Sequence, residues 1–115
     1  MIYSLSDDAL KEKGAVITAR EIEQQPRLWE ETWGIYQDSR EKITQFFENV
    51  TQAHEHVQVI FTGAGTSAYV GNTVLPYLKG QVDETQWTLS SVATTDLVSN
   101  PREYFNPALP TLLVS

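Results

Sequence analysis

The pattern of apolar residues divides the chain into a helical first half and a second half in which short strands alternate with helices. Apolar positions three and four residues apart between Pro26 and Val50 predict a long amphipathic helix, interrupted only by Gly34. Segments 57–62, 87–92 and 111–115 predict three strands. Strands that alternate with helices indicate a parallel sheet covered by helices on both faces. The sequence therefore predicts an α/β fold preceded by an N-terminal helical segment.

Two shorter helices are expected before the long one. Ser6 is a typical N-cap for the first helix, whose first turn is acidic and whose last turn carries lysines, and Gly14 follows its end. A capping box at residues 18–21 predicts the start of the second helix. Pro26 predicts the end of that helix and the beginning of the long one, because proline is favoured at a first helical position.

One side of the long helix is aromatic. Trp29, Trp33, Tyr36 and Phe47 recur at helical spacing on that side. A face of this kind either stacks on a cofactor or packs against protein. We expect it to pack against the sheet or against a partner subunit.

A polar link at residues 52–56 is expected to lead into the first strand. A helix at residues 66–78 and a turn at residues 80–84 should connect the first strand to the second. A helical turn at residues 94–99, stopped by Asn100-Pro101, and a proline-containing loop at residues 102–110 should lead to the third. Residues 1–52 are thus expected to form the helical segment, and residues 53–115 the first part of an α/β domain. The third strand is apolar and stands at the end of the chain without a further neighbour, so the domain is expected to be incomplete.

A glycine turn between the first strand and the following helix is the main candidate for a binding site. Gly63 and Gly65 let the backbone approach a ligand closely, and the N–H groups and dipole of the helix favour an anion. Thr66 and Ser67 place two hydroxyls at the same point. Several short neutral donors suit a terminal monophosphate, so the turn predicts a phosphate-ester site.

The residues of this turn allow other interpretations. No lysine follows the glycines as a nucleoside-triphosphate loop requires. A dinucleotide fingerprint remains possible on spacing, with Ala68 in the third glycine position, but no acid closes the second strand. The turn could also bind nothing, and Thr66 and Ser67 could serve only as helix N-caps.

Polar residues at the end of the second strand are the next candidates. Thr94, Thr95 and Asp96 should lie on the same rim of the sheet, where Asp96 could bind a sugar hydroxyl or amino group. Capping of the following helical turn is the slightly favoured alternative. His54 and His56 precede the first strand, so they are expected at the opposite end of the sheet and on the surface.

Composition narrows the classes of partner. A net charge of −7, a pI near 4.6 and the lack of a Lys/Arg cluster argue against nucleic-acid binding. The chain has 0 cysteines, which excludes disulfides and thiolate chemistry and fits the cytoplasm. No segment is expected to span a membrane, and no metal or organic cofactor is implied.

The glycine turn and the start of the following helix, residues 63–69, resemble the first phosphosugar-binding loop of the SIS (sugar isomerase) domain. Segments 18–22, 25–29 and 93–105 are similar to the tagatose-6-phosphate ketose/aldose isomerase branch of this family. Members of that branch are also described as galactosamine-6-phosphate deaminase/isomerases. The resemblance covers most of the chain, but proteins of this family are much longer. It implies a flavodoxin-like layering, and a homo-oligomer that acts on a phosphorylated sugar or amino sugar.

The resemblance also implies roles for single residues. The position that matches Ser67 meets the phosphate, and the one that matches Thr66 lies beside the sugar. Aldose–ketose interconversion needs a base that moves a proton between two carbons. This chain carries the phosphate grip without an obvious base, so its catalytic residues are expected beyond Ser115. A non-catalytic phosphosugar sensor is the alternative from another class, and a dehydrogenase is a more distant one.

Overall fold

A computed structural model describes residues 4–115 of the chain, in two compact units, one up to Thr44 and one from Gln45 to Ser115. The long helix α2, Val16–Ala53, runs from the first unit into the second. Each unit is described by itself below. The domain boundary expected after residue 52 stays a prediction.

The first unit opens with the short helix α1, Asp7–Glu12. Ser6 is its N-cap, and the Ser6 hydroxyl accepts a hydrogen bond of 3.2 Å from the Ala9 N–H group. Lys13 is the C-cap, and Gly14 follows with a φ of 63°, a conformation that glycine adopts at little cost. The predicted first helix and both of its ends are confirmed.

Helix α2 is continuous from Val16 to Ala53, so the expected second helix and its end at Pro26 are wrong. Residues 18–21 lie inside the helix and do not cap it. Pro26 removes one backbone hydrogen bond and crowds the preceding turn, at a cost of about 3 kcal/mol. Good helix formers such as arginine, glutamate and glutamine flank it on both sides, and they carry the helix through this local defect.

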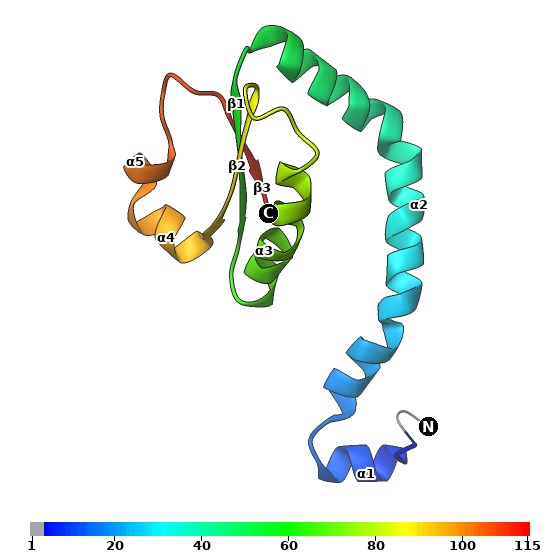
Figure 1. The fold of residues 1–115 in the computed structure, drawn as a ribbon. Coiled ribbons are helices and arrows are strands. Elements are labelled where there is room, and N and C mark those ends of the chain that lie inside the picture. Colours follow the sequence, from blue (N-terminus) through cyan, green and yellow to red (C-terminus); the bar gives the residue numbers. More distant parts are fainter. Residues whose placement is uncertain (1–3) are drawn as a thin grey trace. The chain divides into compact units, whose positions relative to one another are not determined.

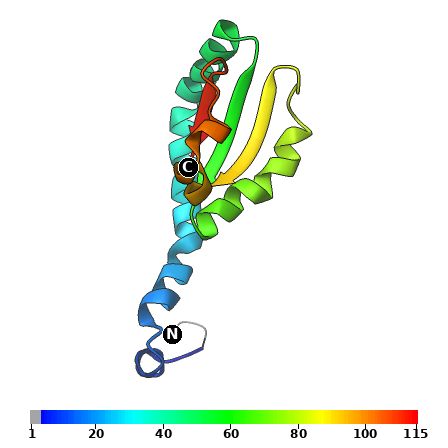
Figure 2. The same ribbon diagram turned by 90° about the vertical axis from the view of Figure 1, so that its left-hand side faces the viewer.

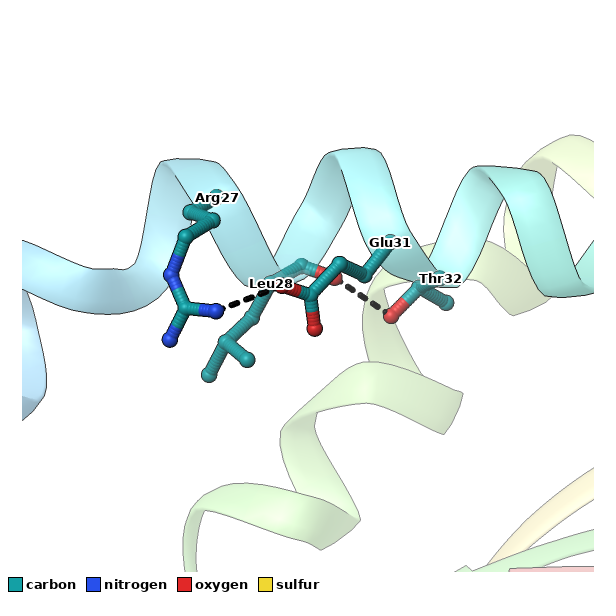
Figure 3. A network of polar contacts seen from close by, with 4 residues as sticks. All are labelled: Arg27, Leu28, Glu31 and Thr32. Atoms are coloured by element: carbon teal, nitrogen blue, oxygen red, sulfur yellow. Dashed lines mark hydrogen bonds and ion pairs between the residues drawn. The ribbon is translucent and has the colours of Figure 1, made fainter.

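Contacts within α2 are local, as Figure 3 shows for one stretch. Arg27 forms an ion pair with Glu31 one turn later, and the Thr32 hydroxyl donates a hydrogen bond of 2.7 Å to the Leu28 carbonyl. The aromatic side is largely open to solvent: Trp29 is 66% exposed and Trp33 is 59% exposed. For Trp29 and Trp33, packing against the sheet or against a partner subunit stays a prediction. Phe47 of the same side lies in the second unit, where its ring packs on Trp87 with the centroids 6.2 Å apart, so the predicted contact with the sheet is confirmed for this residue.

The second unit is built on a sheet of three parallel strands in the order β2-β1-β3. Figure 2 shows the three strands side by side, with β1 in the middle. Strand β1 is Val57–Gly63, β2 is Trp87–Ala93 and β3 is Thr111–Val114. All three predicted strands are confirmed.

Helices cover both faces of this sheet, as Figure 1 shows: α3 lies on one face, and α4 and α5 lie on the other. Helix α3 is Thr66–Lys79, α4 is Thr94–Ser99 and α5 is Pro101–Tyr104. The predicted α/β fold class and the stop at Asn100-Pro101 are confirmed. The predicted loop from residue 102 is partly wrong, because Pro101 opens a further helical turn at a position that suits proline.

The residues of β1 alternate between the two helical layers. Phe61 lies against Gly71 of α3, whereas the Gln58 side chain donates a hydrogen bond of 3.1 Å to the Tyr104 carbonyl of α5. Odd-numbered residues of β1 therefore face α3, and even-numbered residues face α4 and α5. Val57 and Ile60 are fully buried and form the centre of the core of this unit.

Side-chain hydrogen bonds connect residues at the end of the sheet where the strands begin, which is called the amino edge below. His56 Nδ1 lies 2.8 Å from the Thr85 carbonyl, and Nε2 lies 2.6 Å from the Thr88 hydroxyl. A carbonyl only accepts hydrogen bonds, so Nδ1 carries a proton and donates it to Thr85. The Thr85 hydroxyl and N–H group donate to the Asp83 carboxylate, and these hydrogen bonds lower the pKa of Asp83 below its ordinary value. His54 and His56 lie at the predicted end of the sheet, but His56 is half-buried and structural.

Candidate functional site

The predicted site residues lie in the two connections that follow β1 and β2, at the end of the sheet where the strands finish, which is called the carboxyl edge below. Gly63 pairs with Ala93 at the ends of β1 and β2, so the chain leaves both strands at the same level. Helix α3 follows β1 after two residues, and α4 follows β2 directly. Adjacent strands lie about 4.8 Å apart, so the two connections begin as close neighbours.

Gly63 is required by close packing at the start of α3. A Cβ atom at this position would lie 2.6 Å from the Ser67 carbonyl carbon and 2.7 Å from the Ala68 nitrogen. Both are backbone atoms that cannot move without displacing the helix. The absence of a side chain therefore lets the first turn of α3 fold back against the end of β1.

Gly65 is required by conformation, because its φ is 59° and its ψ is −128°. Residues other than glycine rarely adopt such angles. This residue is the N-cap of α3 and turns the chain so that the following N–H groups point outward from the helix start. Within residues 4–115, the N–H groups of Ala64, Gly65 and Thr66 have no hydrogen-bond acceptor. Unpaired N–H groups and the helix dipole make this turn favourable for an anion.

The hydroxyls of Thr66 and Ser67 are not caps. No side chain caps α3, and both residues are exposed in its first turn. The alternative role that the sequence allowed for them is therefore wrong. Their hydroxyls remain available to a ligand beside the free N–H groups.

The second connection presents Thr94, Thr95 and Asp96. No side chain caps α4 either, and its N-cap is Ala93, so capping by these residues is also wrong. Thr95 and Asp96 are exposed. The half-buried Thr94 hydroxyl lies 3.2 Å from the hydroxyl of Thr62, the last side chain of β1 before the glycine turn.

Two residues at this edge were missed by reasoning from the sequence, Thr62 and Gly71. A Cβ atom at Gly71 would lie 2.8 Å from Phe61 Cβ and 2.9 Å from Ser91 Oγ, so this glycine sets the spacing between α3 and the sheet. A glycine inside a predicted helix is the signal that could have indicated such a contact. For Thr62 the signal is weaker, a polar residue at the end of a buried strand.

Three hollows in the second unit lie elsewhere. The largest, of about 670 Å³, is bounded by His54 and Asp83 at the amino edge. A second, of about 440 Å³, lies between Gln58 and Arg102, and a third, of about 240 Å³, lies beside Trp87. None of these three hollows is lined by a predicted site residue.

The described part of the chain shows neither a metal site nor a membrane span. Among residues 4–115, no three His, Asp or Glu side chains are placed to hold a metal ion. Across the same residues, no helix combines the length and the apolar character that crossing a bilayer requires.

The geometry places the second unit among α/β proteins in which a glycine turn at a helix N-terminus stands at the carboxyl edge of a parallel sheet. Comparison with solved structures narrows this class. The chain matches the crystal structure of tagatose-6-phosphate ketose/aldose isomerase from Escherichia coli with a TM-score of 0.73 and 41% identity, over 84% of this chain and 25% of that one.

Comparison with curated sequences gives the same relationship. The chain is 41% identical to the D-galactosamine-6-phosphate deaminase AgaS of Escherichia coli over 98 residues, which are 85% of this chain and 24% of the relative. It is 35% identical to the AgaS protein of Shewanella sp. (strain ANA-3) over 111 residues, or 96% of this chain and 28% of the relative. No family model matches the chain.

These similarities confirm the resemblance inferred from the glycine turn and segment 93–105. The chain is related to the tagatose-6-phosphate isomerase branch, and its second unit is a partial SIS-like α/β fold. The chain spans about a quarter of the length of the relatives that it matches.

Proposed function

We propose that this chain supplies the phosphate-binding part of a sugar-phosphate isomerase or amino-sugar-phosphate deaminase. The substrate class is a 6-phosphate of the tagatose or galactosamine type, the compounds that the names of its relatives state. The glycine turn binds the phosphate, and residues 94–96 bind the sugar. Proton transfer is carried by groups outside residues 4–115.

The observation that carries this proposal is the unpaired state of the glycine turn. Three N–H groups, at residues 64–66, and the hydroxyls of Thr66 and Ser67 have no partner in the described chain, and all lie at the start of the 14-residue helix α3. A phosphate dianion accepts several hydrogen bonds from neutral donors without a basic side chain. This explains how a chain with a net charge of −7 can bind an anion.

Placement of the phosphate at this turn sets the position of the sugar. The turn and the start of α4 leave adjacent strands at the same level, because Gly63 pairs with Ala93. A sugar extending from the phosphate along the rim therefore meets Thr94, Thr95 and Asp96. The carboxylate of Asp96 suits a sugar hydroxyl or an ammonium group. Holding the reacting carbons in place is what a phosphate grip contributes to catalysis.

The direct test is a titration of the isotope-labelled chain, followed by backbone amide NMR. Galactosamine 6-phosphate and tagatose 6-phosphate should shift the amide signals of residues 64–67, and galactosamine without phosphate should not. Inorganic phosphate should shift the same signals but leave those of residues 94–96 unchanged. Absence of any shift at residues 64–67 with all phosphate-bearing probes would contradict the proposal.

Substitutions sharpen this test. Gly65→Val adds a side chain where φ is 59° and should abolish the phosphate-dependent shifts. Thr73→Ala is the matched control, because Thr73 is an exposed hydroxyl residue later in the same helix whose hydroxyl donates to the Tyr69 carbonyl. It should leave the shifts unchanged. Equal effects of the two variants would mean that general damage to α3, and not the turn, is responsible.

We also propose that the protein acts in the cytoplasm and as a homo-oligomer. The absence of cysteine in the chain fits a reducing compartment. The exposed Trp29 and Trp33 are of the residue type that is enriched in subunit interfaces. Cell fractionation tests the location, and sedimentation tests the assembly, with Trp29→Ala expected to shift it toward the monomer.

A further inference from the structure

A hydroxyl pair connects the two strands that carry the proposed site. The Thr62 and Thr94 side-chain oxygens lie 3.2 Å apart, and the pair is partly shielded from solvent. Thr62 is the last residue of β1 before Gly63, and Thr94 is the first residue of α4. The contact therefore joins the strand that leads into the glycine turn to the segment proposed to bind the sugar.

The alternation of β1 explains why the hydroxyl of Thr62 reaches this place. Phe61 faces α3 and Gln58 faces α5, so Thr62 lies on the same side of the sheet as Gln58 and α4. Ladder pairing sets Thr62 opposite Val92, two residues before Thr94. The side chain thus leans forward along the sheet toward the point where α4 begins.

We propose that Thr62 is a positioning residue, which holds the Thr94 hydroxyl at a fixed place beside the glycine turn. This inference rests on the proposed function and adds to it a residue that does not itself touch the ligand. When Thr62 donates to Thr94, the Thr94 hydroxyl keeps its own proton for a sugar oxygen. A hydroxyl fixed in this way loses less freedom when the ligand binds, which strengthens binding.

The test uses three variants of the full chain. Thr62→Val keeps the shape of the side chain and removes its hydroxyl, and Thr62→Ser keeps the hydroxyl. Thr88→Val is the matched control, because Thr88 is also a threonine with a side-chain hydrogen bond, at the amino end of β2, where its hydroxyl lies 2.6 Å from His56. It removes one hydroxyl contact between β2 and the residue that precedes β1, at the edge away from the site.

Two readouts are measured for each variant. The first is amide hydrogen exchange at the end of α4, where the Asn100 N–H donates to the Asp96 carbonyl, relative to exchange in the core of β1. The second is the dissociation constant for galactosamine 6-phosphate. Thr62→Val should selectively raise the exchange and weaken binding between about threefold and about tenfold. Thr62→Ser and Thr88→Val should leave both close to the wild-type values.

The outcomes separate this inference from the proposed function. If Thr62→Val and Thr88→Val change the α4 exchange equally, the hydroxyl pair does not position Thr94 and the inference is overturned, whatever the ligand does. If the exchange changes selectively but binding is equal in Thr62→Val and the wild type, its role in the site is overturned. If the wild-type chain binds no sugar phosphate, the proposed function fails and takes the site role of Thr62 with it.

Discussion

Replacement of Gly71 by alanine should destabilise the α/β unit, although alanine is the better helix former. The added methyl group would lie 2.8 Å from Phe61 Cβ, which is fixed to the backbone of β1, and 2.9 Å from Ser91 Oγ. Overpacking of this kind costs about 1–3 kcal/mol, while the gain in helix propensity is about 0.5–1 kcal/mol. The net loss should be about 1–2 kcal/mol, because the nearest atom cannot move without the strand.

Gly34→Ala provides the control. Gly34 lies inside α2, and a Cβ atom there would meet nothing within 4 Å. The same substitution should therefore stabilise α2 by about 0.5–1 kcal/mol. Since the sequence change is identical, the opposite sign isolates the contact between α3 and the sheet.

Hydrogen exchange resolved along the sequence measures both effects, because it separates the two units that a global melting curve would combine. Amides of β1 should exchange faster in Gly71→Ala, and amides around residue 34 should exchange more slowly in Gly34→Ala. For a unit of this size, the lost stability corresponds to a fall in its melting temperature of about 4–8 °C per kcal/mol. Unchanged or slower exchange in β1 of Gly71→Ala would refute the close spacing of α3 and the strand.

Three further predictions concern the site, the amino edge and the reaction. Ser67→Ala should weaken sugar-phosphate binding roughly ten- to hundredfold, which is the effect of losing a hydrogen bond to a charged group. The melting temperature should not change, because Ser67 does not cap α3. Calorimetry and a melting curve check both results, and a fall in melting temperature would indicate a capping role. The lowered pKa of Asp83 means that this carboxylate contributes to stability above the ordinary carboxylate pKa, about 3.9, and that the contribution is lost as the pH falls through the lowered value. Acid unfolding of Asp83→Asn should lack this dependence on pH. Identical acid unfolding of the variant and the wild type would contradict the prediction. The 115-residue chain alone should bind tagatose 6-phosphate and galactosamine 6-phosphate without turnover, since both histidines precede β1 at the amino edge; formation of a new sugar or of ammonia above the buffer rate would show that a base lies within the chain.

Much of the α/β unit could be predicted from the sequence, because its strands are short runs with β-branched residues, a glycine ends β1 and a proline precedes β3. The first half was harder to predict. Pro26 predicts a helix boundary, but the penalty of one proline is local, and the helical preferences of its neighbours outweigh it. Pro101 predicts the end of α4, and the same residue also favours the start of the next helical turn.

The glycines of the candidate site were predictable, whereas the contacts across its elements were not. Gly63 and Gly65 were identified because a strand, a glycine turn and a helix follow each other directly in the chain. The roles of Thr62 and Gly71 depend on partners that lie ten or more residues away, Thr94 and Phe61. Periodicity tells which residues share a face of one element, but it does not tell which residue of another element meets them.

The pairing of β1 with β2 is flanked by two side-chain links, one from the residue before β1 and one to the residue after β2, and these links have a joint consequence for strand alignment. His56 reaches Thr88 and Thr62 reaches Thr94, and both links span 32 positions of the sequence. If β1 slipped by one residue against β2, its side chains would turn to the opposite faces, and both links would break together with the packing of Ile60. Misaligned pairings therefore lose three kinds of interaction at once, and the pair of strands has a single favourable alignment from one edge of the sheet to the other.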